Sequence, residues 1–145
     1  MSITTNELIT ELNALIRMTE AEAAIARSRT VQARDDAVRR ELEANAREAG
    51  RRRDRLVEAV RELGGAPDLL GAAIGRVGAF ARTQTLDQAV PVQQALMADL
   101  ALEHQLRDRA RFARVIAEHL DETGIVRLLE RIEDAHAETV EWIEQ

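Results

Sequence analysis

Glu103 stands out chemically in this sequence, because a carboxylate occupies a position where the helical pattern favours an apolar side chain. It lies in a run from Val92 to Leu120 whose apolar residues recur at the spacing of one helix face. A buried carboxylate without a partner costs several kcal/mol, so Glu103 needs a cation, a metal ion or a proton. The apolar members of this face are Leu96, Leu100, Leu106, Ala110, Ala113, Ala117 and Leu120.

Three other stripes at helical spacing also carry polar residues near their middle, with apolar residues on both sides. Because the helices of a bundle bury such faces against one another, we expect the polar residues to meet at one level. They are Thr19 and Glu22 within residues 8–26, with Glu20 at the edge of that stripe, Asn45 and Arg52 within residues 38–63, and His136 within residues 125–143.

Each of these polar residues also has a plainer interpretation. The Arg51-Arg52-Arg53 run is either a solvated basic patch or a run from which Arg52 turns inward, since successive residues turn by about 100° around a helix. A single histidine such as His136 is commonly a core or boundary residue with its hydrogen bonds satisfied. Because His136 lies at the same level as the polar residues of the other stripes, a shared cluster is favoured. His104 points away from the stripe of Glu103, and we expect it at the surface.

The composition favours a single all-α domain spanning residues 1–145. Charged residues make up 32% of the chain, hydrophobic residues 46% and aromatic residues only 2%, which is typical of helical proteins. The absence of Cys excludes disulfides and thiolate chemistry. A net charge of −6 argues against nucleic-acid binding, and no apolar run has the length of a membrane span. We therefore expect a cytoplasmic protein without nucleic-acid or membrane partners.

The sequence predicts two helices before residue 64. The first begins at the Thr4-Thr5 pair, whose hydroxyls suit an N-cap, and ends in a turn within residues 28–36. The Asp35-Asp36 pair then caps the second helix, although a continuous helix to Leu63 is the alternative. Gly64-Gly65-Ala66-Pro67 is a strong signal for the end of the second helix.

Two more helices follow a long connection over residues 68–90. This connection contains an apolar, glycine-containing stretch that is too short to span a membrane. We expect it to pack along the bundle, where it could also form a subunit contact. Pro91 then marks the start of the third helix, which ends within residues 121–124, and the fourth helix occupies the remainder. Two helices, a crossover and two helices form a known bundle connectivity.

Several short segments give the chain a resemblance to bacterioferritins. Asp99-Leu-Ala-Leu-Glu103 and Val140-Glu-Trp-Ile-Glu144 resemble the third and fourth helices of that family. Leu12–Ile16 resembles its first helix, and Leu63–Pro67 resembles the end of its second. The chain is also similar to short ferritin-like domain proteins of actinobacteria. The resemblance implies a ferritin-like antiparallel four-helix bundle with a long crossover between the second and third helices.

The resemblance also implies a di-iron site, which bacterioferritins build from one Glu on each of helices one and three and a Glu-x-x-His pair on each of helices two and four. Glu103 matches the helix-three ligand. The helix-two pair falls on Ala49 and Arg52, neither of which can bind iron. The methionine that holds haem in the family falls on Gly50, so no haem is expected.

The other two helices match the di-iron pattern only in part. The helix-one ligand falls on Thr19, with Glu20 and Glu22 nearby. The helix-four pair falls on His136 and Thr139. Sliding helix four by nearly one turn restores a Glu133-x-x-His136 pair. An alternative set of residues could surround a single iron, manganese or zinc ion. It comprises Glu22, Glu48, Glu103, Glu133 and His136.

Two classes of function therefore stay open. In the first, Glu22, Arg52, Glu103 and His136 form a buried polar cluster in which the Arg52 cation replaces the irons. The protein is then a non-catalytic structural or interaction module, without cofactor, packed as a homodimer or with another protein. In the second, an altered site binds iron or manganese for storage or oxidation, as in a di-metal ferroxidase.

Overall fold

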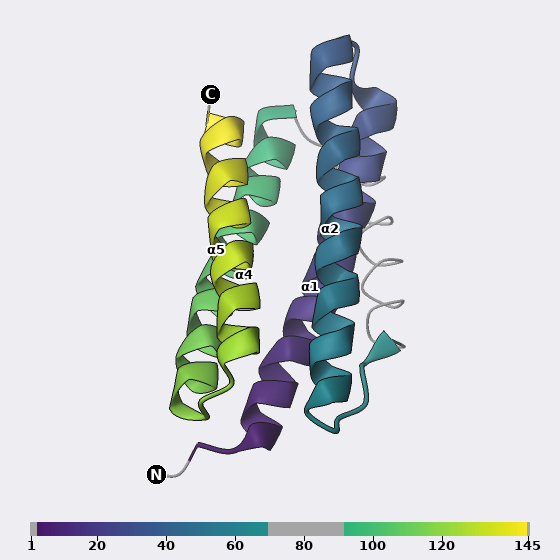
Figure 1. Ribbon diagram of the computed structural model, residues 1–145. Coiled ribbons are helices and arrows are strands. Elements are labelled where there is room, and N and C mark those ends of the chain that lie inside the picture. The colour runs from purple at the N-terminus through teal and green to yellow at the C-terminus, as the bar shows by residue number, and fades with distance from the viewer. Residues whose placement is uncertain (1–2, 70–91, 145) are drawn as a thin grey trace.

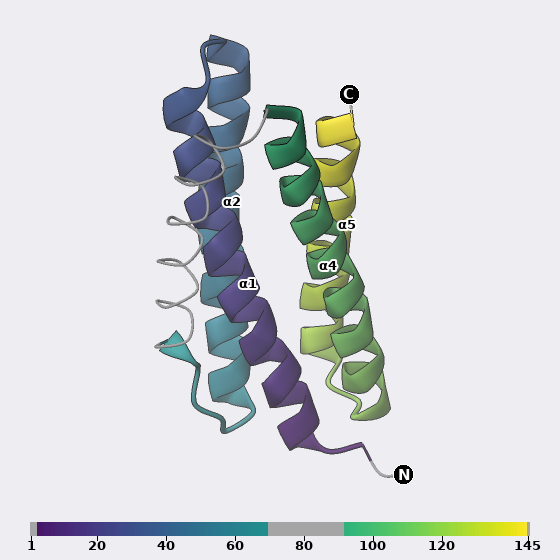
Figure 2. The ribbon, with the colours of Figure 1, turned by 180° about the vertical axis from the view of Figure 1, so that it is seen from behind.

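The computed structural model describes residues 3–69 and 92–144, with side chains from residue 97 onward in the second range. Within these ranges the chain forms helices α1 (Thr5–Gln32), α2 (Asp36–Glu62), α4 (Val92–His119) and α5 (Thr123–Glu144), and no strand. Helices α1 and α2 form one antiparallel pair and α4 and α5 another, and the pairs meet chiefly through α1 and α4 (Figures 1 and 2). The predicted all-α four-helix bundle is confirmed.

Helices α2 and α4 run in the same direction in this bundle, as the colours of Figure 1 show. This is the ferritin-like arrangement, in which a crossover separates the second and third helices of the bundle. The prediction that the apolar crossover packs along the bundle falls on residues 70–91, which lie outside the described residues.

The turn between α1 and α2 falls within the predicted range. The N-cap of α1 is Thr4, whose side chain accepts a hydrogen bond from the amide of Glu7. Asp35 caps α2, because its carboxylate accepts from the amides of Ala37 at 2.8 Å and Val38 at 3.2 Å. The alternative of one continuous helix is wrong, since Asp35 satisfies amides that a continuous helix would bond internally.

The end of α2 is tied to α1. Gly64 adopts a φ of +81°, which the predicted glycine stop supplies without strain. A Cβ on Gly65 would lie 3.0 Å from the side chain of Ile9, so glycine lets the turn approach α1 closely. Asn13 then accepts from the amide of Asp68 at 2.9 Å and donates to the carbonyl of Ala66.

Helix α4 ends at His119, two residues before the predicted range of 121–124. Asp121 adopts a left-handed φ of 55°, and the amide of Glu122 donates to the carbonyl of Ala117 at 3.0 Å. Helix α5 already begins at Thr123, so Gly124 belongs to its first turn.

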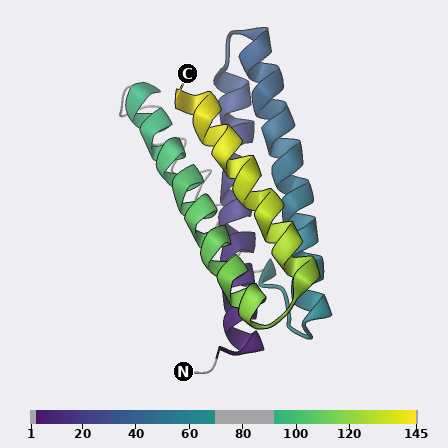
Figure 3. The same ribbon diagram turned by 60° about the vertical axis from the view of Figure 1, so that its left-hand side comes forward.

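The buried core differs between the two halves of the bundle. The apolar half lies towards the α4–α5 turn and is filled by aliphatic side chains from all the described helices. The polar half lies towards the α1–α2 turn, where α2 and α5 diverge (Figure 3). The fully buried members of the apolar half include Leu8, Leu12, Leu15, Ile16, Leu56, Val60, Leu106, Ala110, Ala113, Ala117 and Leu129.

Candidate metal centre

A buried cluster lies where the apolar half meets the polar half. Glu22 from α1, Arg52 from α2, Glu103 from α4 and His136 from α5 are each between 0% and 8% exposed. Each replaces one apolar residue in its stripe, so the packing that buries the neighbouring aliphatic residues buries these side chains too. The structure therefore brings together one polar residue from each of the four stripes. Of the other two polar residues in these stripes, Thr19 is buried and Asn45 is half-buried.

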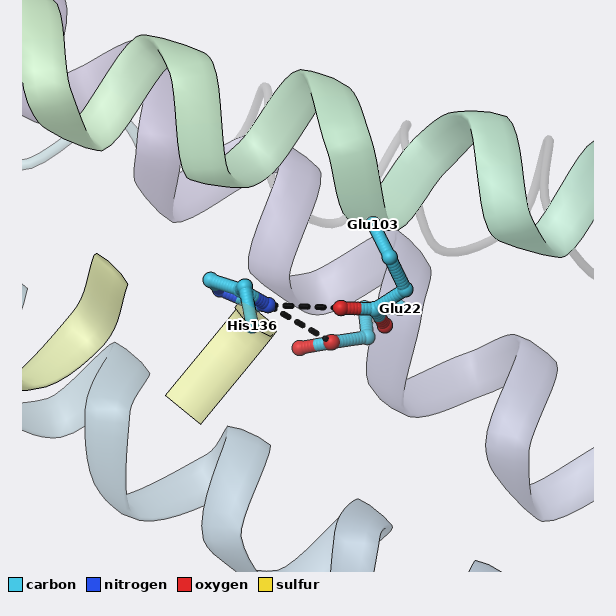
Figure 4. Close-up of side chains that lie close together, drawn as sticks. All are labelled: Glu22, Glu103 and His136. Atoms are coloured by element: carbon cyan, nitrogen blue, oxygen red, sulfur yellow. Dashed lines mark hydrogen bonds and ion pairs between the residues drawn. The ribbon is translucent and has the colours of Figure 1, made fainter. Parts of the chain in front are cut away.

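The contacts within the cluster join it into one chain of polar atoms. Nη2 of Arg52 donates to Oε1 of Glu22 at 2.9 Å. On the other side, Nδ1 of His136 lies 2.6 Å from Oε2 of Glu103 and 3.3 Å from Oε2 of Glu22 (Figure 4). The imidazole thus points between the two carboxyl groups, and the guanidinium closes the cluster from α2.

The two carboxyl groups respond to this environment in opposite ways. Burial opposes the ionisation of Glu22, but its interactions with Glu103, His136 and Arg52 outweigh burial and lower its pKa to about 2. Burial and the adjacent Glu22 carboxylate raise the pKa of Glu103 to about 8. Glu103 is therefore the carboxyl group that takes up a proton near neutral pH, while Glu22 stays ionised.

The imidazole of His136 is held in its charged form. Burial disfavours the imidazolium, but the contacts with Glu103 and Glu22 outweigh burial and raise the pKa of His136 to about 9. When His136 and Arg52 are both cationic and both carboxyl groups are ionised, the four charges of the cluster sum to zero. Protonation of Glu103 would add one positive charge, so the cluster has no net negative charge at neutral pH.

The other members of the predicted metal set point elsewhere. Glu48 is exposed and forms an ion pair with Arg51 on the same face of α2. Glu133 bridges two arginines of α4, with distances of 3.1 Å to Nε of Arg111 and 2.6 Å to Nε of Arg114. Neither carboxylate belongs to the group whose ligand atoms converge in the bundle.

The remaining positions of the family pattern provide no ligands to the cluster. Ala49 is fully buried and Thr19 is buried beside the cluster, whereas Thr139 donates its hydroxyl to the carbonyl of Ala135 in its own helix. Glu20 is also buried, but it pairs with Arg53 at 3.0 Å. Of the three consecutive arginines, Arg52 alone is buried, as the inward-turning interpretation requires.

Two features near the cluster were not found from the sequence. An ion pair of 2.9 Å between Arg29 of α1 and Asp99 of α4 joins these helices in the polar half. Beside it a cavity of about 300 Å³ reaches Glu22 and Glu103. The spacing of residues in the sequence does not reveal which side chains on different helices form a pair. The one available signal was Asp99, which belongs to the segment that resembles bacterioferritins.

The cluster supplies fewer donor groups than a pair of irons requires. Among the described residues, Glu22, Glu103 and His136 form the group with ligand atoms within 4.8 Å of one another. A bacterioferritin-type pair requires four Glu and two His, so three donors do not fit two irons. Arg52 also occupies Oε1 of Glu22 with a fixed positive charge. Within the described ranges, this cluster therefore offers three donors where a bacterioferritin-type centre uses six.

Comparison with known proteins places the fold. A crystal structure from Bacillus anthracis str. Ames, described as ferritin like, diiron-carboxylate proteins, is similar with a TM-score of 0.77 and 17% sequence identity. The match covers 99% of this chain and 97% of that chain. No protein-family model and no curated protein matches the sequence. The fold is therefore ferritin-like, and at this identity the similarity concerns the fold alone.

No helix in the described part of the chain combines the length and the apolar character needed to cross a membrane.

Proposed function

We propose that this protein is a ferritin-like bundle in which an internal salt-bridge cluster replaces the metal centre, and that it acts as a non-catalytic structural or interaction module. The observation that carries the proposal is the 2.9 Å contact between Arg52 and Glu22. It puts a permanent cation on the level of the bundle where the resemblance implies iron ligands.

Charge balance supports this proposal. Two carboxylates would attract a divalent cation strongly if nothing else compensated them. Here Arg52 and His136 already compensate both carboxylates. A bound divalent cation would therefore leave excess positive charge in a buried site, which is costly.

The proposal is tested by elemental analysis of the purified protein after loading with ferrous iron, manganese and zinc in turn. We expect less than a stoichiometric amount of each metal after gel filtration, with normal helical content by circular dichroism. Two iron atoms per chain that are lost in Glu103→Ala would overturn the proposal and restore oxidation chemistry as the function.

A gain-of-ligand variant makes the same test sharper. The double substitution Ala49→Glu with Arg52→His supplies the helix-two pair that the family pattern requires and removes the competing cation. We expect this variant to retain metal that the natural sequence does not retain. The matched control is Ala49→Glu alone, which adds a carboxylate but keeps Arg52, and which we expect to remain without metal.

A second candidate function is a single-metal site made by Glu22, Glu103 and His136. The observation that favours it is the convergence of their ligand atoms within 4.8 Å. One oxygen-rich ion with one imidazole suits iron, manganese or zinc. One metal atom per chain, lost in His136→Ala but kept in Glu133→Ala, would establish this function in place of the first.

An interaction role also needs a contact surface, and we propose a homodimer. Phe112 and Val115, three residues apart on α4, are 57% and 40% exposed, and large apolar side chains at such spacing favour helix–helix association. Sedimentation of the natural protein should give a dimer, and Phe112→Asp should give a folded monomer. A natural protein that is monomeric at all concentrations would refute the dimer.

A further inference from the structure

We propose that the cavity beside the buried cluster binds a small, largely apolar molecule carrying one neutral hydrogen-bond donor, such as an alcohol or a phenol. The cavity lies in the polar half, between residues of α1, α2, α4 and α5. This inference goes beyond a structural role, and it does not depend on whether the cluster holds a metal ion.

The size and walls of the cavity favour a small apolar ligand. Its volume of about 300 Å³ is at the lower end of the range for small-molecule sites. A dry apolar cavity of about 150 Å³ can hold benzene, so a molecule about twice that size has room here. The walls are mainly aliphatic and aromatic, and they include Ile25, Leu42, Leu102, Trp142 and Ile143.

The polar end of the cavity requires a hydrogen-bond donor. Glu22 and Glu103 both line the cavity, and Glu22 is 3% exposed. Oε2 of Glu22 is held by the 3.3 Å ion pair with Nδ1 of His136, but this nitrogen lies closer, at 2.6 Å, to Oε2 of Glu103. Oε2 of Glu22 therefore keeps capacity to accept a further hydrogen bond. A buried carboxylate oxygen with spare accepting capacity is stabilised by a further hydrogen-bond donor, which a ligand could supply.

The charges around Glu22 favour a neutral donor over a charged one. Arg52 and His136 already provide a cation for each carboxyl group of the cluster. An ammonium group would therefore bring an uncompensated positive charge into a buried place. A carboxylate would meet Glu22 directly and be repelled. A hydroxyl group avoids both penalties, because it donates without carrying charge.

The cavity contains its own reporter. Trp142 is the only tryptophan of the chain and forms part of the wall, so its fluorescence is sensitive to an occupant. Aliphatic probes do not absorb where tryptophan does. They can therefore be titrated while the emission of Trp142 is followed.

The experiment compares four probes that share one alkyl chain, namely 1-octanol, 1-methoxyoctane, octylamine and octanoate, in metal-free buffer. We expect saturable binding of 1-octanol, about tenfold tighter than that of each of the other three, since one buried hydrogen bond or charge penalty is of that size. Preference for octylamine or octanoate would overturn the neutral-donor argument. Equal binding of 1-octanol and 1-methoxyoctane would show that Glu22 accepts no bond from the ligand and would overturn it as well.

A pair of Ala→Leu variants locates the binding. Ala26 is buried and lines the cavity, so Ala26→Leu should fill part of it and reduce 1-octanol affinity by about tenfold or more. Ala37 is exposed on α2 outside the cavity, and Ala37→Leu should leave affinity unchanged. Equal affinities of the two variants would place the alcohol elsewhere on the protein and refute the site.

A chain-length series keeps the inference testable should Ala26→Leu fail to fold. In the natural protein, affinity should rise from 1-butanol to 1-octanol as the walls are covered and stop rising beyond the length that the cavity holds. A steady rise through 1-dodecanol, without a limit, would indicate adsorption on an open surface and overturn the proposal.

Discussion

The two halves of the bundle core differ in what holds the same helices together. In the apolar half, residues such as Leu12, Leu56, Leu106 and Leu129 are fully buried against one another. In the polar half, ion pairs and a cavity occupy the corresponding space, and α2 and α5 diverge. Close packing supplies stability in the first half, whereas the second depends on charges that must compensate one another.

This difference indicates where the protein can tolerate a functional site. A packed aliphatic core is nearly insensitive to pH and has no room for a ligand. The polar half has titratable groups, a carboxylate oxygen with spare accepting capacity and a cavity. The bundle remains folded because the apolar half carries most of the buried aliphatic area and leaves the other half free to be polar.

The largest effect is expected from removing the cation of the polar half. Arg52→Ala leaves Glu22 buried without its guanidinium partner and should lower the free energy of unfolding by about 3–5 kcal/mol. Urea unfolding followed by circular dichroism measures the loss. Arg51→Ala is the matched control, because its ion pair with Glu48 is exposed and should contribute less than about 1 kcal/mol. Equal losses in the two variants would mean that Glu22 does not depend on Arg52.

A Leu→Ala pair compares packing in the two halves. Leu129→Ala removes a fully buried side chain from the apolar half and should cost about 2–5 kcal/mol. Leu42 is only half-buried and borders the cavity, so Leu42→Ala should cost about 1 kcal/mol. The same urea experiment measures both changes. Similar costs would show that the polar half is as tightly packed as the apolar half.

The pH dependence of stability should come from the polar half. The pKa of Glu103 rises from 4.5 to about 8 on folding, and that of His136 rises from 6.5 to about 9. The folded state therefore binds these protons more tightly, so their stabilisation is complete at low pH and is lost as pH rises through about 8 and 9. Glu22 acts in the opposite sense, since its pKa is lowered to about 2 and its stabilisation is lost in acid.

This dependence can be measured as the free energy of unfolding between pH 6 and 10, where each proton contributes a slope of at most about 1.4 kcal/mol per pH unit. We expect stability to fall in this interval. Glu103→Gln removes one of the two titrating groups and should flatten the curve, whereas Glu133→Gln, which lies outside the cluster and pairs with Arg111 and Arg114, should leave its shape unchanged. A natural protein with constant stability across the interval would contradict the assignment.

Much of the fold could be predicted from the sequence, because local signals decide it. The helical spacing of the aliphatic residues, the Asp35 cap and the Gly64-Gly65 stop each act within a few residues. The level of the polar breaks also indicated that Glu22, Arg52, Glu103 and His136 would meet, and the structure places them in contact. Residues at the same height on packed helices are brought together by geometry alone.

The remaining features depend on which side chains of different helices pair with one another, and the spacing of residues in the sequence does not reveal this. The alternative metal set included Glu48 and Glu133, the latter as part of a Glu-x-x-His pair, but both carboxylates form ion pairs with nearby arginines outside the cluster. The Arg29–Asp99 pair and the cavity depend on how far the helices diverge. The distance between the helices cannot be inferred from the sequence pattern, so neither the ion pair nor the cavity was predicted.

The smallest effect concerns two ion pairs that join α1 to α4, one in each half. Arg29 and Asp99 lie 2.9 Å apart with 11% and 15% of their side chains exposed, whereas Arg109 and Glu11 lie 3.2 Å apart with Arg109 44% exposed. Double-mutant cycles to Ala should give a coupling of about 1 kcal/mol for the first pair and about 0.2–0.5 kcal/mol for the second, since solvent screens the exposed charges. Salt should weaken the second coupling more than the first. Equal coupling energies with equal salt dependence would show that solvent screens both pairs alike. Buried ion pairs would then not explain the stability of the polar half.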